Sequence, residues 1–158
     1  MTLQPKPPSA SRSEMTEIIL PSDANPLGSV FGGKVMQWID IAGAISAGRH
    51  CRRNVVTASM DELHFHAPMH VGDVAVLVGR VQAAFKTSME VAVTVHSEKP
   101  LTGDRKLCTS AFLTFVALDE NGRPVEVPAL LPETDEERQL LERAMARRKA
   151  RLARKPQG

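Results

Sequence analysis

Hydrophobic and polar residues alternate along residues 55–65, and three further stretches are rich in Val, Ala, Thr or Phe. These stretches cover residues 73–85, 89–98 and 106–119, and turn-forming residues separate them. Such segments are typical of β-strands. A shorter run at residues 16–20 is closed by Pro21 and predicts one more strand near the N-terminus.

The segment from Gly33 to about Cys51 follows another pattern, because hydrophobic residues occupy nearly every face of a helix there. A helix that is hydrophobic all round is a buried helix. The order is one strand, this helix, and then four strands without another helix. That order favours antiparallel connections, with the helix against the concave face of the sheet. The sequence therefore predicts an α+β fold.

A second helix is predicted at the C-terminus, where Thr134 and Glu137 are spaced as in a capping box. Its hydrophobic stripe is narrow, so we expect its first half to pack on the body and its end to fray. The predicted organisation is a disordered segment at residues 1–14, one packed domain at 15–132, and a C-terminal helix with a basic tail at 133–158.

Length and composition limit the class of protein. A chain of 158 residues with 42% hydrophobic residues suffices for one core. No run reaches membrane-spanning length, and the N-terminal residues lack the hydrophobic segment of a signal peptide. The two cysteines, Cys51 and Cys108, are too few for a disulfide framework or a four-ligand zinc site. These features favour the cytoplasm.

The net charge of +2 is unevenly distributed, because seven of the twenty Lys and Arg residues lie between positions 143 and 155. The remaining thirteen basic residues face eighteen acidic ones, so the body is mildly acidic and the tail is basic. The tail has no interleaved aromatic residues, and the chain has no Tyr. Charge therefore gives no support for nucleic-acid binding.

Residues 25–40, NPLGSVFGGKVMQWID, place the carboxylate of Asp40 among hydrophobic residues. Burying a carboxylate is costly unless it is paired or used. Gly32 and Gly33 allow close approach to the start of a helix, where the first N–H groups have no internal partner and the dipole is positive.

Asp40 follows Gly33 by seven residues, so its side chain lies on the same helical face, about 10 Å along the axis, and leans back toward the N-terminus. A carbonyl oxygen held by the two glycine amides would have its carbon near Asp40 or near a water bound to it. A structural carboxylate with turn-forming glycines fits the spacing equally well.

The same stretch resembles the motif N-x-x-G-x-x-x-G-G-x-x-[ML]-x-x-x-D of hotdog-fold acyl-CoA thioesterases, of the YciA-like and cytosolic acyl-CoA hydrolase type. Four further stretches resemble this family: VVTASMDELHFHAPMHVGD, AFKTSMEVAV, TFVALDENGRPVEVP and LLPETDEE. Together they cover most of residues 15–137.

The resemblance implies a hotdog fold, in which a curved antiparallel sheet wraps a long helix, and an enzyme that hydrolyses acyl-CoA to a carboxylic acid and coenzyme A without a cofactor. It implies a homodimer with sheets edge to edge, active sites at the interface, and further assembly into tetramers or hexamers. By residue match Asp40 is the catalytic aspartate, and Asn25 is the asparagine that the opposite subunit contributes. The backbone amides at Gly32 and Gly33 would bind the thioester oxygen.

The role of Asp40 stays open between a general base on water and a nucleophile that forms a transient anhydride, and we favour the base with Asn25 orienting the water. Lys86, Thr87 and Ser88 correspond to the family turn that contacts the pantetheine and phosphates of coenzyme A. A polar hairpin turn is equally compatible with them.

Arg52 and Arg53 follow the helix and are candidates for the nucleotide phosphates, although solvated arginines are more common. The basic tail is interpreted mainly as a solvated face, with contact to coenzyme phosphates as the minor alternative. Met36 and Trp38 are interpreted as core residues, with a wall of the acyl pocket as the alternative.

Asp61 is a second carboxylate, and alternation places it with Thr57 on the strand face toward the helix. It is a candidate supporting carboxylate that competes with Asp40, although a structural aspartate is the more frequent case. His64, His66 and His70 raise the question of a metal, but without a nearby Cys pair no metal site is predicted.

Two rival functions are compatible with such a fold. A hotdog dehydratase would need a histidine at the helix or the preceding loop, and none occurs between Met1 and Arg49. A non-catalytic acyl-CoA-binding regulatory module is the alternative that we retain, and the presence of Asp40 and Asn25 argues against it.

Overall fold

The computed structural model describes residues 3–154, which form a curved sheet, two α-helices and two short 3₁₀ helices. In chain order the elements are η1 (Pro8–Ala10), β1 (Ser13–Ile18), η2 (Pro21–Asp23), α1 (Gly32–Cys51), β2 (Asn54–Phe65), β3 (Val74–Ala84), β4 (Ser88–Glu98), β5 (Arg105–Leu118) and α2 (Asp135–Ala153). The predicted strands and both predicted helices are therefore present. Within this range no helix is long and hydrophobic enough to cross a membrane.

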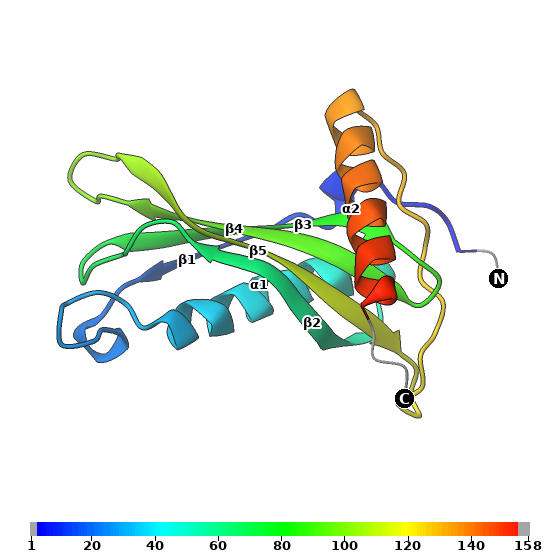
Figure 1. Ribbon diagram of the computed structural model, residues 1–158, viewed down its shortest axis with the longest axis horizontal. Coiled ribbons are helices and arrows are strands. Elements are labelled where there is room, and N and C mark those ends of the chain that lie inside the picture. The colour runs from blue at the N-terminus through cyan, green and yellow to red at the C-terminus, as the bar shows by residue number, and fades with distance from the viewer. Residues whose placement is uncertain (1–2, 155–158) are drawn as a thin grey trace.

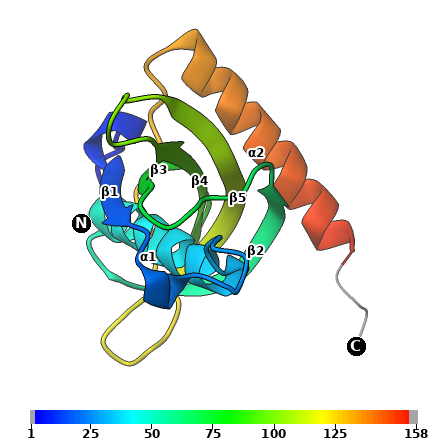
Figure 2. The same cartoon turned by 90° about the vertical axis from the view of Figure 1, so that its left-hand side faces the viewer.

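The five strands form one antiparallel sheet in the order β1-β3-β4-β5-β2. The sheet curves around α1, and α2 lies on its outer, convex side (Figures 1 and 2). Two strands, β1 and β2, are at the edges and pair on one side only. The expected position of the helix on the concave face is confirmed, but its hydrophobic residues are not all buried: Met36, Ile41 and Ile45 are 39–42% exposed in the single chain.

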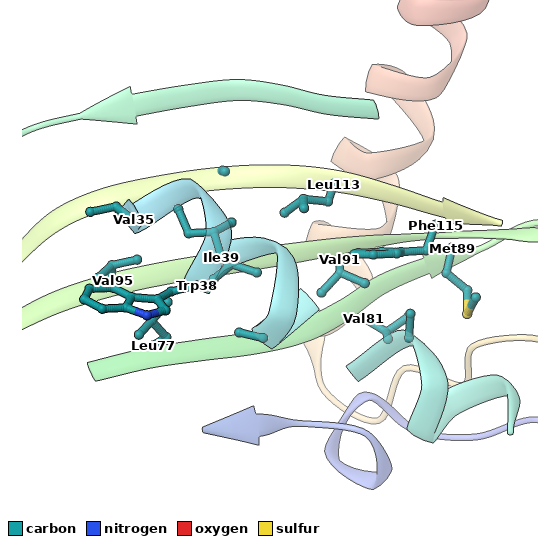
Figure 3. Close-up of a cluster of buried hydrophobic side chains, with 14 of the residues drawn as sticks. Val35, Trp38, Ile39, Leu77, Val81, Met89, Val91, Val95, Leu113 and Phe115 are labelled. Carbon is teal, nitrogen blue, oxygen red and sulfur yellow. The ribbon is translucent and has the colours of Figure 1, made fainter. Parts of the chain in front are cut away.

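The core lies between α1 and the concave face of the sheet (Figure 3). Alternate residues of β4 point into it, and the side chains of Met89, Val91, Val93 and Val95 are fully buried. Each such side chain contributes about 1.5–3 kcal/mol on burial. Trp38 is buried as predicted, whereas Met36 is 39% exposed and is not a core residue.

Gly43 allows the helix to approach the sheet closely. A Cβ atom at this position would lie 2.9 Å from the ring of Phe115 on β5. A larger residue would push α1 away from the strand, so the approach depends on glycine.

The N-terminal segment differs from the disordered stretch predicted for residues 1–14, of which residues 1 and 2 lie outside the described range. Pro8, Ser11 and Ser13 are buried, and β1 begins at Ser13. The hydroxyl of Ser13 donates a hydrogen bond to the carbonyl of Ala42 in α1, at 2.9 Å. Proline and serine composition suggested disorder, but these side chains pack against α1 and the sheet.

The start of α2 follows the prediction, because the Thr134 hydroxyl accepts a 3.1 Å hydrogen bond from the Glu137 amide. The expected fraying of its end is wrong for the described residues: the helix continues to Ala153, and Arg147 and Arg151 in its second half contact the sheet. The narrow hydrophobic stripe did not predict this packing, because the contacts are made by arginine side chains.

Strand β2 is irregular, and at two places the side of the sheet to which its alternate side chains point is reversed. Its pairing with β5 shifts between Thr57 and Ser59, and again between Asp61 and His64. Each bulge inserts residues that face no partner, so the two-residue repeat changes phase along the strand. Glu62, in the second bulge, has a left-handed backbone with φ of 50°.

Candidate active site

Two backbone amides at the start of α1 have no hydrogen-bond partner among the described residues. Phe31 is the N-cap residue and makes no side-chain cap, and its carbonyl accepts hydrogen bonds from the amides of Lys34 and Val35 at 3.0 and 3.2 Å. Within residues 3–154 the amides of Gly32 and Gly33 donate to no other residue. Such amides at a helix N-terminus bind oxyanions.

The two glycines differ in their surroundings. A Cβ atom at Gly33 would meet nothing within 4 Å, whereas one at Gly32 would lie 3.4 Å from the ring of Phe65 on β2. Gly33 therefore lies in open space and Gly32 lies beside an aromatic ring. Both residues are exposed in the single chain.

Asp40 lies two turns into α1 and is half-buried. Its Oδ1 accepts a hydrogen bond of 2.5 Å from the hydroxyl of Thr57 on β2. Thr57 faces α1 because it pairs with Phe115, whose ring packs against the helix at Gly43. One carboxylate oxygen is therefore held by β2, and the other makes no hydrogen bond within the described residues.

Asn25 organises the loop before α1. Its side-chain oxygen accepts hydrogen bonds from the amides of Leu27 and Ser29, at 2.9 and 3.2 Å, which is an Asx-type turn. Its backbone pairs with Ser29 and Gly28 as well. Within residues 3–154 its side-chain nitrogen donates to no residue and is free for a ligand.

Lys86 and Thr87 lie in the turn between β3 and β4, as predicted, and Ser88 is the first residue of β4. The carbonyls of Lys86 and Thr87 accept hydrogen bonds from the amides of Val127 and Ala117, each at 3.0 Å, so later segments of the same chain hold the turn in place. Ser88 pairs with Val116, and Phe115, the residue before Val116, pairs with Thr57. The turn and Thr57 therefore lie at the same end of the sheet.

Arg52 and Arg53 are exposed at the C-terminal end of α1. Arg52 caps the helix in a left-handed conformation, with φ of 54°. It follows Asp40 by twelve residues, which corresponds to about 18 Å along a helix. Both arginines are therefore near the end of the helix that is remote from Gly32 and Gly33.

The structure does not bring Asp61 to the site. Asp61 pairs with Phe112 on β5, and its carboxylate lies 3.6 Å from Arg151 of α2 on the convex side of the sheet. The predicted facing of Asp61 toward the helix is wrong, because the bulge after Thr57 changes the phase of the strand. Asp40 therefore has no second carboxylate from Asp61.

The three histidines make their contacts with residues other than Asp40. The rings of His64 and His66 are 6.0 Å apart, and the His66 ring is hydrogen-bonded to Ser110 at 3.1 Å. The backbone amide of His70 donates to Asp73. Among residues 3–154 no three His, Cys, Asp or Glu side chains are grouped so that they could hold a metal ion.

Comparison with known proteins matches residues 27–103 to the thioesterase superfamily. A Bacillus subtilis protein named uncharacterized acyl-CoA thioester hydrolase YkhA is 46% identical over 145 residues, which make up 92% of this chain and 84% of that protein. The chain belongs to the thioesterase superfamily.

Solved structures resemble nearly all of this chain. An apo-hexameric acyl-CoA thioesterase is 47% identical, with a TM-score of 0.92 over 96% of this chain and 97% of the other. An acyl-CoA hydrolase from Staphylococcus aureus, solved with butyryl coenzyme A, coenzyme A and coenzyme A disulfide, is 36% identical, with a TM-score of 0.88 over 95% and 92% of the two chains. The predicted hotdog fold is confirmed.

Thr57 is a residue of the candidate site that the sequence did not single out. Alternation along residues 55–65 placed it on the face toward the helix, which the structure confirms. A polar, β-branched residue on an inward face was the available signal. The same Staphylococcus aureus hydrolase has been solved with an aspartate, an asparagine or a threonine replaced by alanine.

Proposed function

We propose that this member of the thioesterase superfamily hydrolyses acyl-CoA thioesters to a carboxylic acid and coenzyme A. The observation that carries the proposal is the hydrogen-bonded pair of Asp40 and Thr57, two helical turns below the unpartnered amides of Gly32 and Gly33. This arrangement has an oxyanion site, a base, and a group that orients the base. The acyl-CoA hydrolases among its relatives support the same reaction.

The variants of the Staphylococcus aureus hydrolase support the choice of Asn25, Asp40 and Thr57 as site residues. The asparagine and aspartate replaced there are 15 positions apart, and the aspartate and threonine are 17 positions apart. Asn25, Asp40 and Thr57 have the same intervals in this chain. Because three residue types agree at two spacings, we assign Asn25, Asp40 and Thr57 to the same positions as the residues replaced in that hydrolase.

In the proposed reaction the thioester oxygen accepts hydrogen bonds from the amides of Gly32 and Gly33. Asp40 takes a proton from a water molecule, whose oxygen forms the bond to the carbonyl carbon while the carbonyl electron pair moves to the oxygen. The oxyanion then collapses, the C–S bond breaks, and coenzyme A leaves as a thiolate that recovers the proton from Asp40. Thr57 holds one carboxylate oxygen, so the other faces the water.

The site is proposed to be shared between two copies of the chain, with Asn25 of one orienting the water beside Asp40 of the other. Thr57 lies on the edge strand β2 and holds Asp40 of α1, and among residues 3–154 this strand has no partner on its outer side. Nearby hydrophobic side chains remain exposed, with Val56 at 47% and Ile41 at 42%. The hexameric relative supports a homo-oligomer of at least two chains, with the hexamer as the favoured assembly.

Coenzyme A is proposed to bind at the end of the sheet that carries the turn of Lys86, Thr87 and Ser88. Arg52 and Arg53 are the candidates for its phosphates. The support is positional, because this turn lies at the same end of the sheet as Thr57 and both arginines are exposed.

The proposed reaction uses no metal or other cofactor, because the donors at the site are one carboxylate, one hydroxyl and backbone amides. The cytoplasm is the proposed compartment. Both cysteines, Cys51 and Cys108, are free and buried, which fits a reducing environment.

The proposed function is tested by thiol release from acyl-CoAs between acetyl and palmitoyl, with aromatic and hydroxylated members included. Turnover of at least one member supports it and gives the acyl preference. Tight acyl-CoA binding without any thiol release would favour the non-catalytic binding module instead.

A further inference from the structure

The second half of α2 contacts the convex face of the sheet through charged side chains. Figure 2 shows α2 crossing outside the curved sheet, on the side opposite to α1. Among the described residues of α2 only Ala144 is buried. The side chains of Arg147 and Arg151 are each 19% exposed, so these two arginines are largely covered for such a residue type.

Arg147 contacts three strands at once. Its guanidinium forms an ion pair of 2.7 Å with Glu90 on β4 and donates a 3.3 Å hydrogen bond to Gln82 on β3. The same group lies 3.7 Å from the ring centre of Phe112 on β5. Glu90 is 1% exposed, so its charge depends on Arg147 for compensation.

Arg151 lies one helical turn after Arg147 and contacts β2, a strand other than the three that Arg147 contacts. Its Nη1 is 3.6 Å from Oδ2 of Asp61 on β2. Asp61 is 32% exposed at its side chain, so this ion pair is partly shielded from water. Two arginines one turn apart therefore connect α2 to β2, β3, β4 and β5.

Within one chain, strand β2 has fewer backbone partners than the inner strands of the sheet. Among residues 3–154 it pairs with β5 alone, and two bulges interrupt that pairing. It also carries Thr57, whose hydroxyl holds Asp40. Thr57 precedes Asp61 by four residues. The position of the Thr57 hydroxyl therefore depends on the register of a bulged strand.

We propose that α2 is a strap that positions β2 for catalysis, with Arg147 as its anchor and Arg151 as a positioning residue. Arg151 acts through Asp61 to fix β2, and β2 in turn fixes the Thr57 hydroxyl on Asp40. The effect on turnover rests on the proposed function. The effect on the mobility of β2 does not.

Binding of coenzyme phosphates is the competing role for these arginines. Both are already paired with carboxylates of the same chain. A phosphate would have to displace those partners, and displacing Glu90 would leave a buried charge without its partner. The existing contacts therefore favour the strap.

The test compares Arg151→Gln with Arg143→Gln, a matched change at an exposed position of α2. We expect Arg151→Gln to lower kcat about fivefold with little change in KM, and Arg143→Gln to leave both unchanged. Arg151→Lys should restore part of the loss. Hydrogen exchange of amides in residues 54–65 should be faster in Arg151→Gln than in the wild type, and Arg143→Gln should exchange like the wild type.

Asp61→Asn removes the same ion pair from the strand side and guards against a folding defect in one variant. It should reproduce the effects of Arg151→Gln, and the double variant should add little to either. Unchanged exchange in β2 would overturn the strap. A raised KM with unchanged kcat would overturn the strap in favour of phosphate binding. A wild type that releases no thiol would refute the proposed function, and the exchange data would still decide the strap.

Discussion

The hydroxyl of Thr57 lies 2.5 Å from Asp40, and this contact can be removed with little change in shape. Thr57→Val keeps the branched side chain but removes the donor. We expect kcat to fall about tenfold, because the carboxylate loses the group that orients it. Thiol release measures the change, and Thr94→Val on the convex face of β4 is the control. Equal losses in the two variants would contradict a specific role for Thr57.

His50 is fully buried in α1 and its Nε2 is 2.8 Å from the carbonyl oxygen of Pro128. Burial lowers the pKa of His50, and the hydrogen bond to Pro128 opposes this only in part. The unfolded chain therefore binds a proton more readily than the folded one. Its stabilising contribution is present above the unfolded pKa of about 6.5 and is lost as the pH falls below it.

The His50→Gln variant tests this pH dependence. Urea unfolding between about pH 5 and pH 8 should show that the wild type loses more stability toward acid than the variant. The other four histidines are present in both proteins, so the comparison isolates His50. Parallel stability curves would mean that His50 does not control this dependence.

At the scale of elements, the strands and helices follow from their two-residue and helical repeats, because those repeats record which side chains are buried. The bulge after Thr57 could not be predicted in this way, since it leaves the strand-forming composition of β2 unchanged and alters only its phase. That phase decides that Thr57 faces Asp40 and that Asp61 faces α2. The pairing of Arg147 with Glu90 was also hidden, because the two residues are far apart in the sequence.

The cap of α2 gives a prediction for this element. The hydroxyl of Thr134 satisfies the Glu137 amide, so Thr134→Ala should lower the free energy of unfolding by about 1 kcal/mol. Urea denaturation measures the loss, and Gln139→Ala at an exposed position of the same helix is the control. A loss no larger than that of the control would mean that α2 is not part of the cooperative unit.

For the whole molecule, the proposed shared site predicts complementation. Asn25→Ala and Asp40→Asn homodimers should both be poor enzymes. In a random equal mixture half the dimers contain one chain of each, and each such dimer has one site with both native residues, so about a quarter of all sites should recover. Co-expression of the two variants, with mass spectrometry to confirm mixed dimers, provides the measurement. Activity at the mean of the parent variants would place both residues within one chain.

The central claim is that Asp40 performs the chemistry of an acyl-CoA hydrolase, and turnover of the Asp40→Asn variant tests it most directly. Thiol release from the best acyl-CoA should fall about a hundredfold or more, because the amide cannot accept the proton of water. Coenzyme A affinity by calorimetry and the urea midpoint should remain close to those of the wild type. A folded variant that binds coenzyme A and still releases thiol at the wild-type rate would contradict the claim.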